Sequence, residues 1–230
     1  MKYLFLFLLF ITFLNLDAQS IFDKADDFFS KYVREGRVDY KAIKAEPRSL
    51  NELVQEIANY DLSNRRVTAD FEKAFYINAY NILVIEQVVS VIPIYGPLKV
   101  EGFFNGIKHT VMGKEMTLDE LEKDLLYRRF PDPRLHFVLV CAAKGCPPLA
   151  SYSYQPEQLE DQLTTRTKAV LNLDWFIRVE GKKAELSQLF SWYAKDFGDA
   201  ATFINKYRDQ KIGSEMKISS YEYDWSLNDL

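Results

Sequence analysis

Apolar residues are most concentrated between Phe71 and Val89, where they recur at helical spacing. One stripe of this segment comprises Phe71, Ala74, Phe75, Asn78, Asn81, Ile82, Ile85, Val88 and Val89, and the opposite side (Tyr76, Ala79, Leu83, Val84) is also largely apolar. The pattern predicts a central helix that is buried on most sides. Asn78 and Asn81 interrupt the apolar stripe, and a buried amide is costly unless it finds hydrogen-bond partners. These two amides therefore either hold passing backbone in place, the commoner role of buried amides, or form one wall of a polar site.

Shorter patterns predict the remaining elements. Capping boxes at Ser49 to Glu52 and at Thr117 to Glu120 mark the starts of two helices. Helices are predicted at residues 21–33, 49–60, 118–129, 188–197 and 200–207, with another beginning near residue 155, and extended segments are predicted at 103–112, 136–141, 175–179, 183–186 and 217–224. This order predicts an α+β fold, with a central buried helix packed on a small, mainly antiparallel sheet and surrounded by other helices.

The first eighteen residues have the composition of a targeting segment. Lys2 precedes an apolar run at residues 3–14, and a small residue, Ala18, stands at the expected cleavage site. A stable membrane span needs roughly 20 apolar residues, and Asp17 comes too early for one. We expect residues 1–18 to be a signal peptide, with a retained anchor as the alternative, and residues 19–230 to form a single exported domain that is periplasmic or secreted and has no transmembrane span after cleavage.

Charge and motif content restrict the class of partner. The chain has 33 acidic and 29 basic residues, a formal net charge of −4, and no basic run. This balance argues against nucleic acid or an anionic membrane surface as the main partner. No Gly-rich phosphate-binding loop is present in the sequence, and no cofactor is expected.

The residues with the most reactive side chains lie between residues 132 and 149, which contain both cysteines of the chain and one of its two histidines, His136. Cys146 is followed by two prolines, which stiffen its loop. It is either a nucleophile activated by a histidine, or the disulfide partner of Cys141, or a zinc ligand. The Cys-x4-Cys spacing is looser than the usual zinc pattern, so no metal is expected. If 136–141 is a strand it spans about 17 Å, and the following loop must fold back for Cys146 to reach His136; His109 is the other candidate base.

Several separate motifs together resemble one known family. They are Ala74-Phe-Tyr-Ile-Asn-Ala-Tyr-Asn81, Leu118-Asp-Glu-Leu-Glu122, Asp132-Pro-Arg-Leu-His136 with Cys141 and Cys146-Pro-Pro-Leu149, Trp192-Tyr-Ala-Lys-Asp-Phe197, and the closing segment Tyr223-Asp-Trp-Ser-Leu-Asn228. In this order they resemble the family called domain of unknown function 547. The resemblance implies an exported bacterial protein and similarity to the papain-like and transglutaminase-like cysteine fold. It assigns the family's histidine and cysteine positions to His136 and Cys146, and its helix amides to Asn78 and Asn81. Because most papain-like enzymes have the cysteine first, the arrangement here is either permuted or not catalytic.

Two functions are consistent with these residues. The first is a thiol-dependent hydrolase or acyltransferase that acts on an amide or ester of a cell-envelope component. In it Cys146 attacks and His136 (or His109) accepts the thiol proton. Asn78 or Glu72 then orients the imidazole or lines the oxyanion site.

Substrate-binding roles in this enzyme are assigned to Asn81, Tyr80 and Arg134. For Asp196 we favour a salt link at the end of its helix, with a hydrogen bond accepted from the site as the alternative. The second function is a non-catalytic envelope domain that binds peptide, lipid or glycan. Its groove is lined by Tyr76, Tyr80, Trp192, Tyr193 and Trp225, with a Cys141–Cys146 disulfide as a brace.

Overall fold

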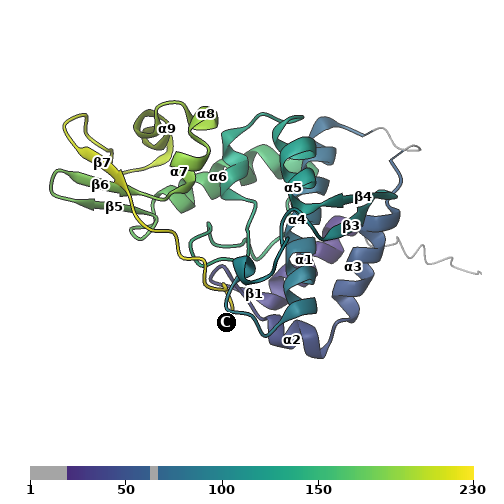
Figure 1. Ribbon diagram of the computed structural model, residues 1–230. Helices are drawn as coiled ribbons and strands as arrows, with labels where there is room; N and C mark the ends of the chain where they lie inside the picture. The colour runs from purple at the N-terminus through teal and green to yellow at the C-terminus, as the bar shows by residue number, and fades with distance from the viewer. Residues whose placement is uncertain (1–19, 63–66) are drawn as a thin grey trace, which may run out of the picture.

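A long central helix, α4 (Ala69–Val91), organises the molecule (Figure 1). The structure is a computed structural model that describes residues 20–62 and 67–230, so the predicted signal peptide lies outside the described residues. Thr68 caps α4 by accepting a hydrogen bond from the Phe71 amide at 3.1 Å. Nearly every side chain from Glu72 to Val89 is buried, which confirms the predicted central helix. The helix is long and apolar enough to cross a membrane, but its burial inside the protein accounts for that composition.

The described residues form further helices. They are α1 (Ile21–Tyr32), α2 (Tyr40–Ala45), α3 (Arg48–Asn59), α5 (Leu118–Glu120), α6 (Leu159–Leu171), α7 (Leu189–Trp192), α8 (Ala194–Phe197) and α9 (Ala200–Tyr207), with 3-10 turns at Pro97–Lys99, Pro133–Phe137 and Pro156–Gln158. Helices α1, α2, α3 and α5 pack directly on α4. Helices α7, α8 and α9 lie at the opposite end of the molecule, beside the largest sheet (Figure 1).

The strands form three small sheets. They are β1 (Val33–Arg34) with β2 (Arg37–Val38), β3 (Lys108–Val111) with β4 (Lys114–Thr117), and β5 (Ile177–Glu180), β6 (Lys183–Leu186) and β7 (Lys217–Ser220) in that order. Every pairing is antiparallel except that of β6 with β7, which is parallel and is reached through α7, α8 and α9. The α+β class predicted from the sequence is confirmed.

Two hydrophobic clusters form the core of the described residues. The larger surrounds α4 and takes in α1, α3 and the segment from Leu135 to Leu163. The smaller is rich in phenylalanine and lies between the β5–β6 hairpin and α9, around Phe137. His136, a residue of the candidate site, directly precedes Phe137. The candidate site therefore lies where the two clusters meet.

Several predicted elements differ from the structure, including the extended segment at 103–112, which is a turn before β3 begins at Lys108. Residues 136–141 are not a strand: Asp132 caps a 3-10 turn at Pro133–Phe137, and the following backbone bonds to a side chain instead of a neighbouring strand. The box at Ser49 is wrong, because α3 begins at Arg48 without a side-chain cap. The helix at 188–197 is interrupted at Tyr193, which separates α7 from α8.

The predicted helix at 118–129 is present but changes its winding. After α5, residues Leu121–Tyr127 form a π-helix, in which the Arg128 amide donates to the Lys123 carbonyl oxygen. In an α-helix, residues five apart point about 140° from each other. A π-helix bonds residues five apart, so its winding brings Glu122 and Tyr127 onto one side.

Candidate functional site

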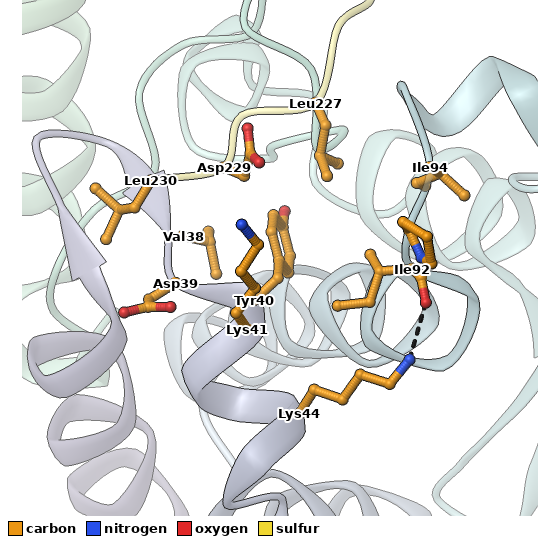
Figure 2. A pocket seen from close by; sticks show the side chains of 11 residues that line it. Val38, Asp39, Tyr40, Lys41, Lys44, Ile92, Ile94, Leu227, Asp229 and Leu230 are labelled. Carbon is orange, nitrogen blue, oxygen red and sulfur yellow. Dashed lines mark hydrogen bonds between the residues drawn. The ribbon is translucent and has the colours of Figure 1, made fainter.

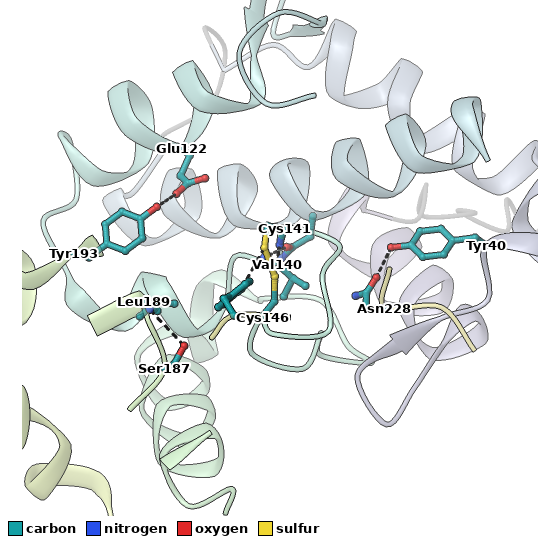
Figure 3. The surroundings of a disulfide bond; sticks show 11 residues. Tyr40, Glu122, Val140, Cys141, Cys146, Ser187, Leu189, Tyr193 and Asn228 are labelled. Atoms are coloured by element: carbon teal, nitrogen blue, oxygen red, sulfur yellow. Dashed lines mark hydrogen bonds between the residues drawn. A yellow bond between two sulfur atoms is a disulfide. The ribbon is translucent and has the colours of Figure 1, made fainter. Parts of the chain in front are cut away.

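The two cysteines form a disulfide. Cys141 and Cys146 are bonded with their Cα atoms 6.3 Å apart, and the Cys141 amide also donates to Cys146 Sγ at 3.1 Å (Figure 3). Of the alternatives for Cys146, the structure shows the disulfide. In this state neither sulfur is a thiolate, so a nucleophilic role for Cys146 requires prior reduction.

The loop that carries the disulfide is held by two distant segments. A Cβ at Gly36 would lie 2.1 Å from Pro148 Cβ, so only glycine allows the β1–β2 turn to approach the two prolines this closely. On the other side the amides of Lys144 and Gly145 donate to the carbonyl oxygens of Ser226 and Asp224, both at 2.8 Å. The disulfide loop is therefore fixed between the N-terminal hairpin and the C-terminal segment.

The disulfide forms part of the wall of a cavity of about 280 Å³, which we call the aromatic pocket. Aromatic side chains are the largest group in its lining, 7 of 15 residues, and two carboxyl side chains and one imidazole accompany them. The lining residues are Tyr80, Phe104, Asp119, Glu122, Tyr127, His136, Leu139, Cys141, Cys146, Pro147, Leu189, Trp192, Tyr193, Tyr223 and Trp225. They come from α4, the π-helix, the disulfide loop, α7 and the C-terminal segment, so the pocket exists only in the folded chain.

Glu122 is a buried carboxyl group of the aromatic pocket, surrounded by tyrosine hydroxyls. Tyr193 Oη donates to Glu122 Oε1 at 3.0 Å (Figure 3). The phenols of Tyr80 and Tyr127 face the same carboxyl group and favour its charged form. Burial raises the pKa of Glu122 above its usual range, although the three phenols act in the opposite direction. Asp119, one turn earlier, adds to the rise in the pKa of Glu122. The sequence analysis assigned no role to Glu122. The one feature of the sequence that singled it out was its position in the Leu118–Glu122 motif.

His136 also lines the aromatic pocket, packed among aromatic rings. Its ring centroid is 4.0 Å from that of Tyr193 and 4.5 Å from that of Tyr127. Nε2 lies 2.8 Å from Oδ2 of Asp196, and Nδ1 is buried without a hydrogen-bond partner among the described residues. Burial lowers the pKa of His136, and Asp196 opposes that change. Asp196 thus bonds to His136, which was the less favoured of its two alternatives, and neither Asn78 nor Glu72 is hydrogen-bonded to this imidazole.

The two helix amides of α4 hold passing backbone. Asn78 bonds to the main chain of Tyr154, and Asn81 bonds to the main chain of Val138 and Val140. Neither amide lines the aromatic pocket. The interpretation of these residues as structural clamps is confirmed, and the expected catalytic role of Asn78 and substrate-binding role of Asn81 find no support in their positions.

Three other predicted site residues lie outside the aromatic pocket. Glu72 forms an ion pair with Arg129. His109, on β3, places Nε2 2.7 Å from Gln87 Oε1 and Nδ1 3.3 Å from Glu86 Oε2.

Arg134, the third of these residues, is held by carboxylates. Its guanidinium binds Asp132 and Glu160 at 2.6 and 2.7 Å. These ion pairs occupy guanidinium N–H groups of Arg134 with which an anionic substrate would have to bond. Of the substrate-binding residues predicted, Tyr80 alone lines the pocket.

A second cavity, of about 300 Å³, lies where α2 meets the C-terminal segment (Figure 2). Two of its polar groups are already engaged: Tyr40 Oη donates to Asn228 Oδ1 at 2.7 Å, and Lys44 Nζ donates to the Ile92 carbonyl oxygen at 2.8 Å. The aromatic pocket is the stronger candidate, because it combines a buried carboxyl group, an imidazole and a disulfide.

The fold and pocket define an α+β domain with an aromatic, disulfide-walled cavity. Residues 64–171 match the model of the family described as Protein of unknown function, DUF547, which supports membership of this chain in that family. The matched segment contains Glu122, His136 and both cysteines, whereas α7 and the C-terminal wall of the pocket lie beyond it. No curated protein and no solved structure matches the chain.

Proposed function

We propose that this chain is a non-catalytic binding domain of the cell envelope, which takes a small organic molecule in the aromatic pocket. The observation that carries the proposal is the position of the Cys141–Cys146 disulfide in the pocket wall. A disulfide offers no nucleophile, but it fixes a loop that contributes Cys141, Cys146 and Pro147 to the lining. The lining combines apolar surface with a few convergent polar groups, as is typical of small-molecule sites.

Two features support the proposed envelope location. Residues 1–18 have the composition of a signal peptide. Disulfides persist in the oxidising compartments that exported proteins reach. The disulfide stabilises the pocket wall only where its cysteines stay oxidised. The pocket and the predicted signal peptide are therefore both consistent with an oxidising compartment.

The aromatic pocket can be tested with a panel of small neutral and charged ring compounds by ligand-observed NMR on the oxidised protein. We expect at least one compound to bind, and Trp192→Ala to weaken its binding about tenfold or more, because Trp192 lines the pocket and is 48% exposed at its rim. Tyr95→Ala is the matched control, since Tyr95 is 71% exposed and lies outside the pocket lining. Binding that both variants retain equally would place the ligand elsewhere and contradict the proposal.

A second candidate function is the thiol-dependent hydrolase or acyltransferase acting on a cell-envelope amide or ester. One arrangement favours it: Cys146 and His136 line the same pocket, and Asp196 bonds to His136 Nε2 while Nδ1 has no partner among the described residues. This activity would require a dithiol reductant to convert the disulfide into two thiols.

The two functions separate on the cysteine variants. If the protein is an enzyme, the reduced wild type and Cys141→Ala turn over substrate, and Cys146→Ala does not. A binding domain shows no turnover in either redox state.

A further inference from the structure

The charged groups of the aromatic pocket are all of one sign. Among the lining residues that the structure describes, Asp119 and Glu122 are the acids, and none is lysine or arginine. His136 is the one basic side chain among these lining residues, and burial favours its neutral form. The nearest lysine to Asp119, Lys123, pairs with it at 2.7 Å but is itself not part of the lining. Among the described lining residues, the pocket thus has no lysine or arginine to pair with an anionic ligand.

Aromatic rings supply most of the remaining lining. Trp192, Tyr223 and Trp225 form one cluster, with ring centroids 4.8–5.8 Å apart. Tyr127 and Tyr193 form a second, with centroids 5.7 Å apart, beside Glu122. Aromatic rings attract a cation that lies over their faces, and several rings around one cavity recognise quaternary ammonium groups.

The size of the cavity also limits its ligand. At about 280 Å³ it is close to the lower end of small-molecule sites, which is too small for a chain of sugars or a folded peptide segment. A compact group with methyl substituents fits this volume and makes contact with several rings.

We propose that the aromatic pocket binds a small organic cation of the methylated or quaternary ammonium class. This inference rests on the proposed function and names its ligand. The Glu122 carboxyl group supplies the opposite charge when it is ionised, and the rings replace the water that the ligand loses.

Glu122 also couples binding to a proton. The groups that face it are the phenols of Tyr80 on α4, Tyr127 on the π-helix and Tyr193 between α7 and α8, together with the Asp119 carboxylate. A cation in the pocket favours the charged form of Glu122, so binding releases a proton wherever that carboxyl group was protonated. The affinity for a cation should therefore increase with pH, and that for a neutral ligand should not.

The test compares choline with its neutral isostere 3,3-dimethyl-1-butanol, measured by titration calorimetry on the full oxidised protein. We expect choline to bind about tenfold tighter or more, because the isostere has the same shape but no charge. Glu122→Gln should weaken choline about tenfold and leave the isostere unchanged, and Tyr95→Ala should change neither. Retained binding of the isostere shows that the Glu122→Gln pocket is still folded.

Each result is decisive. Equal affinities, or a preference for the isostere, overturn the cation inference and leave a binding domain for neutral ligands. If choline and its isostere both fail to bind while the compound panel finds a neutral ligand for the pocket, only the cation inference is wrong. If the panel finds no ligand either, the proposed function falls with it.

Discussion

The side-chain amide of Asn78 bonds to both main-chain polar groups of Tyr154. Asn78 Nδ2 donates to the Tyr154 carbonyl oxygen at 2.8 Å, and the Tyr154 amide donates to Asn78 Oδ1 at 2.9 Å. This is the pair of bonds that a neighbouring antiparallel strand would make. One turn further along α4, Asn81 bonds to the main chain of two residues, the Val138 carbonyl oxygen and the Val140 amide. A helix thus satisfies extended backbone that no strand covers, which explains why two amides lie in an apolar core.

Replacing either amide should destabilise the protein strongly. Asn78→Ala or Asn81→Ala leaves a buried amide and a buried carbonyl group without partners, and we expect a loss of about 3 kcal/mol in the free energy of unfolding. Urea denaturation measures the loss. Asn59→Ala is the matched control, because Asn59 is exposed and bonds to the Gln55 carbonyl oxygen within α3; it should cost less than about 0.5 kcal/mol. Similar losses at all three positions would show that the backbone clamps add nothing.

Removing the disulfide should lower stability without abolishing the fold. Cys141 and Cys146 are separated by five positions, and closing a loop of this length is worth about 2 kcal/mol in the chain-entropy model. The double variant Cys141→Ser/Cys146→Ser should melt about 4–8 °C lower than the oxidised protein. A reductant should lower the melting temperature of the wild type to about that of the variant and have no effect on the variant itself. An oxidised wild type that reacts with a thiol reagent before unfolding would show that the bond is not formed.

The hydrogen bond between Asp196 and His136 should be visible in the titration of the imidazole. Asp196 raises the pKa of His136 against the effect of burial, so Asp196→Asn should move the His136 titration to lower pH. NMR of the imidazole protons follows it, and His109→Gln assigns the two histidine signals. An unchanged titration in Asp196→Asn would mean that the bond is absent in solution.

His136 also has a consequence for stability. The pKa in the folded state is lower than the ordinary value of 6.5. The neutral imidazole's contribution is complete above 6.5 and is lost as the pH falls from there through the lowered pKa. His136→Gln should therefore remove a part of the acid sensitivity that the wild type shows below about pH 6.5.

Glu122 should have the opposite dependence. Its pKa in the folded state is raised above 4.5, so the folded protein holds a proton that the unfolded chain releases, and stability falls as the pH rises from 4.5 through the raised pKa. Glu122→Gln has no such proton, and it should gain stability relative to the wild type over that pH range. Urea denaturation at several values between about pH 4 and pH 8 measures the difference. A difference that does not change with pH would show that Glu122 is ionised normally.

The sequence alone determined much of the local structure. The apolar spacing predicted α4, and the alternatives for Asn78 and Asn81 included the clamp role that they have. The hairpin of β5 with β6 and the helix α9 were also predicted, because each depends on neighbours close in the chain. The α+β class follows from the order of such elements.

Tertiary structure decided the rest. The strand expected at 136–141 is a 3-10 turn and irregular chain, since its hydrogen bonds go to Asn81, a residue distant in the sequence. Asp196 pairs with His136 from 60 positions away, and phenols from three elements enclose Glu122. Neither arrangement can be recognised from the spacing of apolar residues in the sequence. Local spacing reports which residues are buried, but contacts between distant segments decide which of those buried groups meet in one pocket.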